Sequence, residues 1–451
     1  MMKNLFIFWV GIILMSAAPA SHAQKIWSLQ NCIDYAIENN IQIKQQSLNN
    51  QYQQNLLHQA KSDRLPSLNG QIGNNYNFGR SLTYENTYEN VNSTSLSGGL
   101  GANITLFNGF SLKNTIAQRE LDLQASLQDL QKTKDDITLS IAASYLEILF
   151  AEELVSVAEA NVEITRQQIN RTQQLVDAGS LARGALLEIE AQLAREELQL
   201  VNSQNQVQLA YLTLYQFLEL PIAESFKIEK PALPEIKAYV TMANSFDVYK
   251  NALNVRPEII ASQLRVKSME RQLDIAKGAV LPDLSFGANY YNNYNDNYMR
   301  MNSTTGIREV IPFADQIKNN ERYGLGLTLN IPIFNRYQAK NNISNSKLQL
   351  MDYQYRLQTT SNMLRKEIEQ AYTNALASLN RYISSEKAVK STEEAFRYTE
   401  EKFNVGMVNS VEYNQSKNNL TVAHSEHLQA RYEYIFRTKI LDFYNGKPIE
   451  L

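Results

Sequence analysis

The sequence predicts a mainly α-helical protein with a membrane β-sheet component. A duplicated unit of strand pairs and very long helices forms a β-barrel with a helical extension. Three observations predict this fold class. The chain contains an internal duplication. Each copy has a stretch of about 70 residues without glycine or proline, roughly 100 Å long as a continuous helix. Each copy also has short segments of alternating apolar and polar residues, which is typical of a membrane-spanning barrel.

The duplication is visible in matched blocks of residues. Early in each copy, Ala60, Lys61, Leu65, Pro66 and Leu68 recur 216 positions later as Ala276, Lys277, Leu281, Pro282 and Leu284. Further along, the offset is 227, and eight residues recur at that distance. The pairs are Phe107 and Phe334, Asn108 and Asn335, Lys113 and Lys340, Asn114 and Asn341, Ile116 and Ile343, Ile141 and Ile368, Tyr145 and Tyr372, and Gly179 and Gly406. The second copy therefore carries an insertion between the two blocks, whose length is the 11-residue difference between the offsets.

The N-terminus has the pattern of a secretory signal peptide. Lys3 precedes an apolar core from Leu5 to Leu14, and Ser21-His22-Ala23 forms a cleavage site. The predicted organisation is a signal peptide at 1–23, a first repeat at 24–220, a linker at 221–244, a second repeat at 245–446 and a tail at 447–451. We therefore expect an exported protein that is one elongated body rather than several separate domains.

Composition excludes several classes of protein. The formal net charge of −3 gives no basic footprint for nucleic acid, so we expect no nucleic-acid partner. Cys32 is the only cysteine, so packing rather than an internal disulfide must stabilise the exported chain. After the signal, no segment has about 18 consecutive apolar residues. If the mature chain enters a membrane, it does so as a barrel.

The long helices show coiled-coil periodicity. Steps that alternate between four and three predict a left-handed supercoil. The register in the first copy is Ile137, Ile141, Ser144, Ile148, Ala151, Val155, Ala158, Val162, Thr165, Ile169, Thr172 and Val176. The register in the second copy is Leu364, Ile368, Ala371, Ala375, Ser378, Tyr382, Ser385, Val389, Thr392, Phe396, Thr399 and Phe403. A second apolar stripe (Leu146, Leu149, Leu154, Val157) favours a helix held on two sides, as in a ring. A two-stranded stalk is the alternative.

Each long helix is predicted to turn back at a glycine. The return arms run from Gly184 to Pro221 and from Gly406 to Gly446. Glycine accepts the left-handed conformation that caps a helix, so Gly179 and Gly406 mark the tips of two antiparallel hairpins.

Four short segments alternate as strands do, at about 66–78, 94–107, 282–292 and 322–334. In the last strand the residues predicted to face lipid are Tyr323, Leu325, Leu327, Leu329 and Ile331. In the second strand the corresponding residues are Leu96, Leu100, Ala102, Ile104 and Leu106. The edge of a soluble sandwich gives the same pattern. Four strands cannot close a barrel, since about eight are needed, so the chain must oligomerise, and a dimer or a trimer would both suffice.

The sequence contains no credible catalytic constellation, and we expect neither enzymatic activity nor a cofactor. His424 and His427 are spaced so that they could share a metal on a helix. No cysteine or clear set of carboxylates accompanies them, so we expect solvated polar residues and no metal site.

Several blocks of the sequence resemble the TolC-like outer-membrane efflux protein family. They are Leu29-Gln30-Asn31-Cys32-Ile33 with Ala36-Ile37-Glu38-Asn39-Asn40, Ala252-Leu253 with Arg256-Pro257-Glu258-Ile259, the doubled Leu-Pro-x-Leu, and the tips Ala178-Gly179 and Phe403-Asn404-Val405-Gly406. The resemblance covers nearly the whole mature chain. The order of these motifs, repeated in both copies, is more specific to the family than any single motif.

The resemblance implies a homotrimer. Its 12-stranded outer-membrane β-barrel would be continuous with a 12-helix periplasmic tunnel. The implied function is that of a passive exit duct for small molecules in a tripartite efflux system, with a periplasmic adaptor, an inner-membrane transporter and outer-membrane lipid as partners. The outer-membrane duct of a type I protein secretion system is the alternative within transport. A pore-less periplasmic coiled-coil scaffold is the alternative from another class.

The resemblance also implies site residues. Members of the family close at the periplasmic end through acidic residues after the second tip, which places a gate at Phe403, Val408, Glu412 and Gln415. Of these positions only Glu412 is acidic, and Val408 and Ala185 stand where a salt-bridge latch would be, so the location of the gate carries over without the latch. The residues expected to dock the adaptor are those of the tips, Ala178, Gly179, Ser180, Leu181, Val405, Gly406 and Met407.

Overall fold

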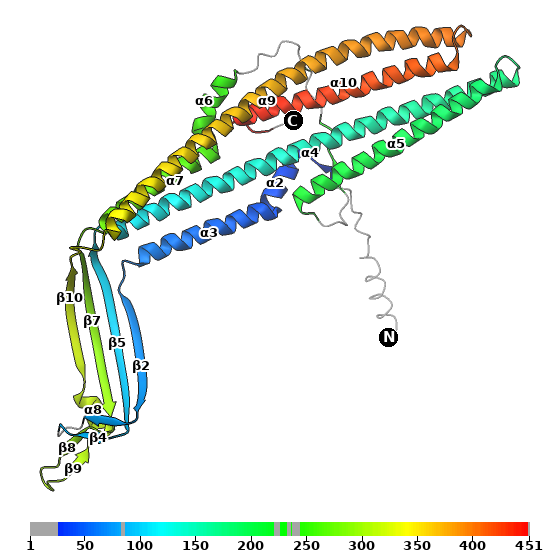
Figure 1. Cartoon of the computed structure of the whole chain (residues 1–451). Helices are drawn as coiled ribbons and strands as arrows, with labels where there is room; N and C mark the ends of the chain where they lie inside the picture. The colour runs from blue at the N-terminus through cyan, green and yellow to red at the C-terminus, as the bar shows by residue number, and fades with distance from the viewer. Residues whose placement is uncertain (1–25, 83–85, 221–225, 232–235, 237–243, 450–451) are drawn as a thin grey trace, which may run out of the picture. The chain divides into compact units, whose positions relative to one another are not determined.

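A computed structural model describes residues 26–82, 86–220, 226–231, 236 and 244–449. The predicted signal peptide and most of the predicted linker lie outside these residues. The chain divides into two compact units. The sheet unit comprises Leu48–Asp129 and Glu258–Thr360, and the helical unit comprises Met1–Ser47, Leu130–Pro257 and Ser361–Leu451. Each unit therefore contains parts of both sequence copies. Figure 1 labels the elements.

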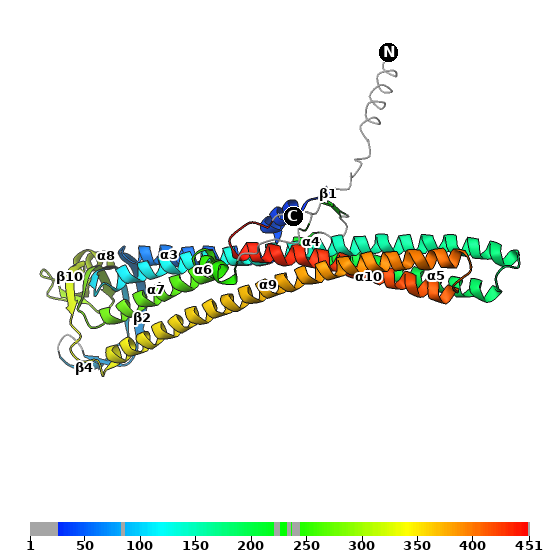
Figure 2. The ribbon, with the colours of Figure 1, turned by 90° about the horizontal axis from the view of Figure 1, so that it is seen from above.

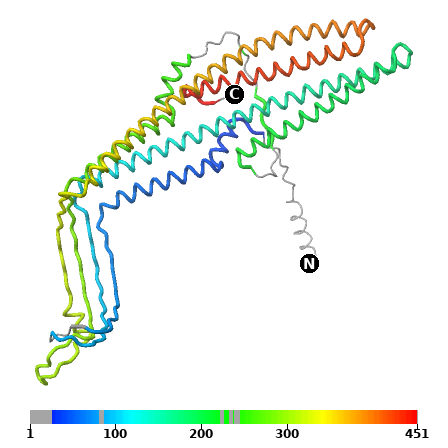
Figure 3. Tube along the Cα trace, viewed as in Figure 1, coloured from blue at the N-terminus to red at the C-terminus, as the bar shows by residue number. Residues whose placement is uncertain are grey.

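The sheet unit contains one four-stranded antiparallel sheet, whose strands lie side by side in Figure 3. The strands are β2 (Ser67–Asn77), β5 (Ser93–Asn108), β7 (Asp283–Asn295) and β10 (Arg322–Asn330), in the order β10-β7-β5-β2. Each copy supplies one adjacent pair, and β5 joins the pairs by hydrogen bonding to β7. Among the described residues, β2 and β10 are edge strands with no partner on their outer side.

The register separates the sheet into an apolar and a polar face. One row across the four strands reads Leu68, Ala102, Ala288 and Leu325. The neighbouring row reads Asn69, Gly101, Asn289 and Gly324. Because successive residues of a strand point to opposite faces, these rows belong to opposite sides of the sheet. The apolar side is open, with Leu68 70% and Leu325 78% exposed.

Two expectations about the strands are wrong in detail. The last strand ends at Asn330 rather than near 334, so Ile331 is not a strand residue. Pro332 explains this end, because proline has no amide to donate to a ladder and restricts the residue before it. Leu106 does not continue the apolar row, because a bulge between Thr105 and Phe107 places Phe107 opposite Leu284.

The segments that connect the strands of each pair fold into small elements of their own. In the first copy these are β3 (Arg80–Leu82) and β4 (Tyr88–Asn90), and in the second copy β8 (Met299–Met301), β9 (Arg308–Val310) and α8 (Phe313–Asn319). The 11-residue insertion falls in the second set. Gln316 of α8 is 1% exposed, accepts from the Asn295 amide (3.0 Å) and donates to the Asn295 carbonyl (2.9 Å).

Two helices of 67 residues dominate the chain, α4 (Ser111–Asp177) and α9 (Gln338–Asn404). The return helices are α5 (Arg183–Leu218) and α10 (Ser410–Tyr444). Figures 1 and 2 show α5 running back along α4 and α10 running back along α9. The remaining helices are α2 (Leu29–Asn39), α3 (Ile41–Ser62), α6 (Ser245–Val255) and α7 (Pro257–Gly278). None of the helices that the structure describes combines the length and apolarity of a membrane-spanning helix.

The predicted coiled-coil registers are confirmed by burial. Every position of both registers is buried or half-buried in the single chain. In the second stripe, Leu146 and Leu149 are buried and Leu154 and Val157 are half-buried. Helix α4 therefore packs on more than one side, as the ring interpretation requires.

The core of the helical unit forms where the short elements meet α4 and α5. β1 (Ile26–Trp27) pairs in parallel with β6 (Lys227–Ile228). The hydroxyl of Tyr145 donates to the carbonyl of Glu229 (2.6 Å), which ties this small sheet to α4. Cys32 is fully buried in the same core, and burial raises the pKa of its thiol to about 12.

Candidate channel gate

The first tip has the geometry that caps a helix with a left-handed residue. Gly179 has φ +73°, its amide donates to the Val176 carbonyl (2.9 Å), and the Ser180 amide donates to the Leu175 carbonyl (2.8 Å). This pair of hydrogen bonds defines a Schellman motif. Ala178, Gly179, Ser180 and Leu181 lie in the turn between α4 and α5.

The second tip repeats this geometry. Gly406 has φ +75°, its amide donates to the Phe403 carbonyl (3.1 Å), and the Met407 amide donates to the Lys402 carbonyl (2.9 Å). Val405 and Met407 are 71% and 75% exposed. Both predicted glycines are therefore left-handed caps, and the second tip presents bare apolar side chains.

The residues predicted to form the gate lie close together in sequence but in different environments. Glu412 and Gln415 are exposed on the first turns of α10, and Val408 is half-buried in the turn before it. The side chain of Asn409 caps α10 by accepting from the Glu412 amide (2.9 Å). Gln415 donates to Asn419 on its own helix (3.1 Å).

Phe403 packs inside the second hairpin. Its ring centroid lies 4.7 Å from that of Tyr413 on α10, and Phe396 lies 5.4 Å from the same ring. Tyr413 is 3% exposed, and burial raises its pKa to about 12. This aromatic cluster holds the start of α10 against the end of α9.

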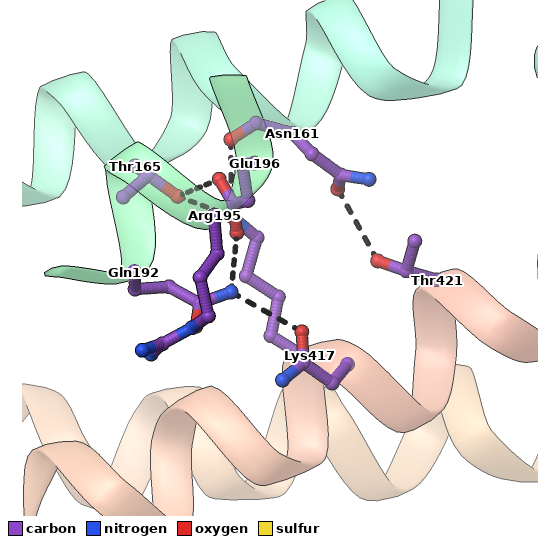
Figure 4. A network of polar contacts seen from close by, with 8 residues as sticks. Asn161, Thr165, Gln192, Arg195, Glu196, Lys417 and Thr421 are labelled. Carbon is purple, nitrogen blue, oxygen red and sulfur yellow. Dashed lines mark hydrogen bonds and ion pairs between the residues drawn. The ribbon is translucent and has the colours of Figure 1, made fainter. Parts of the chain in front are cut away.

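A buried lysine, which the sequence analysis did not single out, joins the two hairpins. Lys417 of α10 forms an ion pair with Glu196 of α5 (3.0 Å) and donates to Thr165 (2.5 Å) and the Asn161 carbonyl (3.0 Å) of α4. The Lys417 and Glu196 side chains are only 5% and 11% exposed. Figure 4 shows Lys417 extending from α10 to this group.

Further polar contacts continue this connection, which we call the hairpin seam. They are Gln192 to Asn418 (3.2 Å), Thr421 to Asn161 (3.4 Å), Arg171 to Asn404 (2.7 Å) and Ser410 to Glu188. All of them join α4 or α5 to the end of α9 or to α10. The seam begins at the second tip and extends along the first turns of α10, so it lies beside the predicted gate.

The Lys417–Glu196 pair is held in an environment that opposes charge. Burial lowers the pKa of the Lys417 amine, and the charge and hydrogen bond of Glu196 act in the opposite direction. A buried pair of this kind is costly to break, because removing one partner leaves an uncompensated buried charge. The seam is therefore suited to holding the two hairpins in one arrangement.

One sequence signal could have led to Lys417. Starting from Ser410, heptad steps along α10 reach Tyr413 and then Lys417, and all three residues are buried. A lysine at a core position predicts a buried partner. No local pattern identifies Glu196, because it lies 221 positions away.

The expectation that the two histidines of α10 are solvated polar residues is wrong for His427. The His427 ring stacks on Tyr382 (centroids 5.0 Å apart), and its Nδ1 lies 3.1 Å from the Ser385 hydroxyl. Burial is the main cause that lowers the pKa of His427 below its usual value of 6.5. Within the described residues, no group of three or more His, Cys, Asp or Glu residues could hold a metal ion.

Comparison with known proteins agrees with this architecture. The family model described as "Outer membrane efflux protein" matches residues 32–218 and 248–442. The chain is 20% identical over 376 residues to the outer membrane efflux protein BepC of Brucella suis, covering 83% of this chain and 76% of BepC. It is 21% identical over 446 residues to the outer membrane protein TolC of Escherichia coli K12, covering 96% and 84%.

Solved structures share the fold. A crystal structure of CusC superposes with a TM-score of 0.78 at 15% identity, covering 93% of this chain and 92% of CusC. The family model spans most of the chain, and both matched segments contain one strand pair, one 67-residue helix and one return helix. The chain thus belongs to the outer membrane efflux protein family, as its duplicated order of elements predicts.

Proposed function

We propose that this protein is the outer-membrane exit duct of a tripartite efflux system, which passively conducts small molecules from the periplasm to the exterior. The observation that carries the proposal is the pairing of two features in one chain. One is a four-stranded sheet with an open apolar face, and the other is a set of two 67-residue helices, each with a return helix. The first suits a membrane barrel and the second suits a tunnel.

Three copies close the barrel in this proposal. The single chain leaves β2 and β10 as edges, and exposed edges seek further strands. Three chains supply twelve strands and a ring of twelve helices. At ~10 Å between neighbouring axes, such a ring leaves a bore of ~28 Å. Two chains leave ~15 Å by the same estimate.

The partners follow from where the helices end. In this proposal the tips at Gly179 and Gly406 point away from the membrane, so the helical hairpins of a periplasmic adaptor dock there. Val405 and Met407 offer an apolar contact for such a partner. The inner-membrane transporter then engages the duct through the adaptor or directly.

The gate lies at the same tips. A threefold ring of Glu412 carboxylates forms the constriction, with Gln415 beside it, and Phe403 supports it from within the hairpin. The hairpin seam keeps α10 against α4 and α5 in the closed state. Opening then requires the second hairpin to separate from the first at the Lys417–Glu196 pair.

The test is the assembly state and conductance of the purified full-length protein. Light scattering with circular dichroism in detergent should give a trimer with β-signal, and planar bilayers should show discrete channels. A monomer that keeps its β-signal would contradict the barrel. Absence from the outer-membrane fraction together with absence of conductance would favour a periplasmic scaffold instead.

Transport of small molecules and secretion of a protein use the same kind of duct. Deletion of the gene in its own host distinguishes them. The proposal expects hypersensitivity to exported small molecules with an unchanged set of secreted proteins. Loss of one secreted protein without altered sensitivity would favour the secretion duct.

A further inference from the structure

Two short segments of the duplication have no role in the proposed function. Phe107-Asn108-Gly109-Phe110 with Lys113-Asn114 recurs as Phe334-Asn335-Arg336-Tyr337 with Lys340-Asn341. We call residues 107–114 and 334–341 the junction segments. The first leads from β5 into α4, and the second follows β10 and leads into α9. Both belong to the sheet unit.

The junction segments share an unusual backbone. Gly109 and Phe110 have φ values of +61° and +64°, and Arg336 and Tyr337 have +54° and +62°. Left-handed backbone is unfavourable for bulky residues, so its occurrence at equivalent aromatic positions in both copies is a feature that calls for a function.

The aromatic side chains also share their arrangement. Phe110 packs edge-to-face on Phe107 (5.2 Å, 88°), and Tyr337 packs edge-to-face on Phe334 (5.7 Å, 87°). Phe110 and Tyr337 nevertheless remain 57% and 63% exposed. Phe107 is half-buried, whereas Phe334 is 72% exposed, so the first junction presents one large ring braced by another and the second presents two. Aromatic rings in such positions are typical of the boundary between lipid and water.

The first junction borders an open cavity of about 550 Å³. Phe110 and Leu281 line it with apolar surface, and Lys113, Asn114 and Lys277 line it with polar groups. Gly109 and Gly278 also line it and approach so closely that a Cβ on Gly278 would lie 2.4 Å from the Gly109 carbonyl oxygen. Asp274 also lines the cavity, which thus combines two lysines and one acid with an apolar wall.

Lysines outnumber acids among the residues that line the cavity. Lys277 pairs with Asp274 (3.1 Å), the one acid that lines the cavity. Lys113 takes part in no ion pair within the described residues, and Lys340 lies 5.7 Å from the centroid of the Tyr337 ring. No aspartate or glutamate occurs between Glu89 and Glu120 or between Glu321 and Asp352. Each junction therefore has an exposed lysine and an exposed aromatic ring, and no acidic residue lies near them along the chain.

The junctions also continue the apolar face of the sheet. Phe107 lies opposite Leu284, the residue that ends the apolar row at this end of β7. If that face contacts lipid, as the proposed function requires, the junctions meet the headgroups at the end of the strands nearest the long helices.

We propose that each junction segment binds the phosphate headgroup of a membrane phospholipid. Lys113 and Lys340 contact the phosphate, and Phe110 and Tyr337 lie beside the glycerol and the first carbons of the acyl chains. A lysine extends toward charge while its stem stays in apolar surroundings, and basic cavities next to membrane segments bind anionic headgroups. This inference rests on the membrane position of the sheet in the proposed function.

The test uses the full-length protein in detergent, titrated with phosphatidylglycerol and followed by native mass spectrometry. We expect Lys113→Gln and Lys340→Gln to weaken binding about fivefold each, the effect of ~1 kcal/mol per lysine near a headgroup. The control is Lys387→Gln, an exposed lysine elsewhere on α9, which should bind as the unaltered protein does. Phe110→Ala should also weaken binding, because the ring contacts the acyl region.

The outcomes are distinguishable. Equal binding by the double variant Lys113→Gln/Lys340→Gln and the unaltered protein overturns the inference, provided that both migrate as the same oligomer. Displacement of the lipid by millimolar inorganic phosphate shows a site for free phosphate and overturns the assignment to lipid. If the variants bind lipid as the unaltered protein does and the channel conducts normally, only this inference is contradicted. Absence of the protein from the outer membrane would contradict the proposed function.

Discussion

The ammonium nitrogen of Lys417 lies 3.0 Å from Oε1 of Glu196, so a buried ion pair joins α10 of the second hairpin to α5 of the first. Thr165 adds a hydrogen bond from its hydroxyl to the same carboxylate (2.5 Å), which brings α4 into the contact. Three of the four helices in the two hairpins thus meet at one buried polar group. This is the contact that we expect to decide how firmly the second hairpin is held.

The first prediction concerns this pair. Lys417→Met should destabilise the hairpin packing by about 3–5 kcal/mol, because it leaves the Glu196 carboxylate buried without its partner. The double variant Lys417→Met/Glu196→Leu should recover much of that loss, since well-packed apolar residues replace a buried pair at little cost. Thermal unfolding of the detergent-solubilised protein measures both.

An exposed pair between α4 and α5, within the first hairpin, provides the control. Arg166 and Glu197 lie 2.9 Å apart with side chains 56% and 46% exposed. Arg166→Gln should change stability by less than about 1 kcal/mol. If the seam also holds the gate, Lys417→Met should show higher single-channel conductance than the unaltered protein, and the double variant should return toward the unaltered value. If all variants have the conductance of the unaltered protein, the seam does not hold the gate closed.

The second prediction concerns ion selectivity. Three Glu412 carboxylates around an axis attract cations, as acidic rings do in cation channels. We expect cation-selective conductance in planar bilayers, with block by divalent cations. Glu412→Gln should reduce both effects, and Glu426→Gln, an exposed acid further along α10, should reduce neither. Unchanged selectivity in Glu412→Gln would mean that the constriction is built elsewhere.

The third prediction concerns the tips. Gly406→Val should strain the turn by about 1 kcal/mol or more, because a β-branched residue is unfavourable at its φ of +75°. We expect weaker crosslinking to the adaptor and reduced efflux. Gly184→Val is the matched control, since Gly184 lies in the first turn of α5 and no atom lies within 4 Å of an added Cβ. Full efflux by the Gly406→Val variant would mean that the second tip does not dock the adaptor.

The fourth prediction concerns pH. Burial lowers the pKa of His427 below 6.5, so on acidification the unfolded chain takes up a proton before the folded chain does. The stability of the second hairpin should therefore fall as the pH drops below about 6.5. Glu386 opposes this shift, whereas Arg431, His424 and Lys390 reinforce it. Hydrogen exchange of α10 at pH 7 and pH 5 measures the effect, and His427→Gln should abolish the difference.

Local patterns along the chain determined much of this protein. The coiled-coil registers, the left-handed tips at Gly179 and Gly406 and the alternating strands all depend on residues within one or two turns of each other. Such residues interact wherever the rest of the chain lies, so periodicity and glycine placement are enough to predict them. Because the chain is duplicated, each of these weak local patterns occurs twice, which strengthens the prediction made from it.

Tertiary structure alone decided which distant residues meet. Lys417 and Glu196 are 221 positions apart, and no local pattern identifies Glu196 as the partner of Lys417. The bulge before Phe107 depends on the register with β7, which a single strand does not reveal. His427 is half-buried because the Tyr382 ring of the neighbouring helix covers it. The physical reason is common to all three: burial and pairing depend on the neighbour across the interface, and that neighbour is remote in sequence.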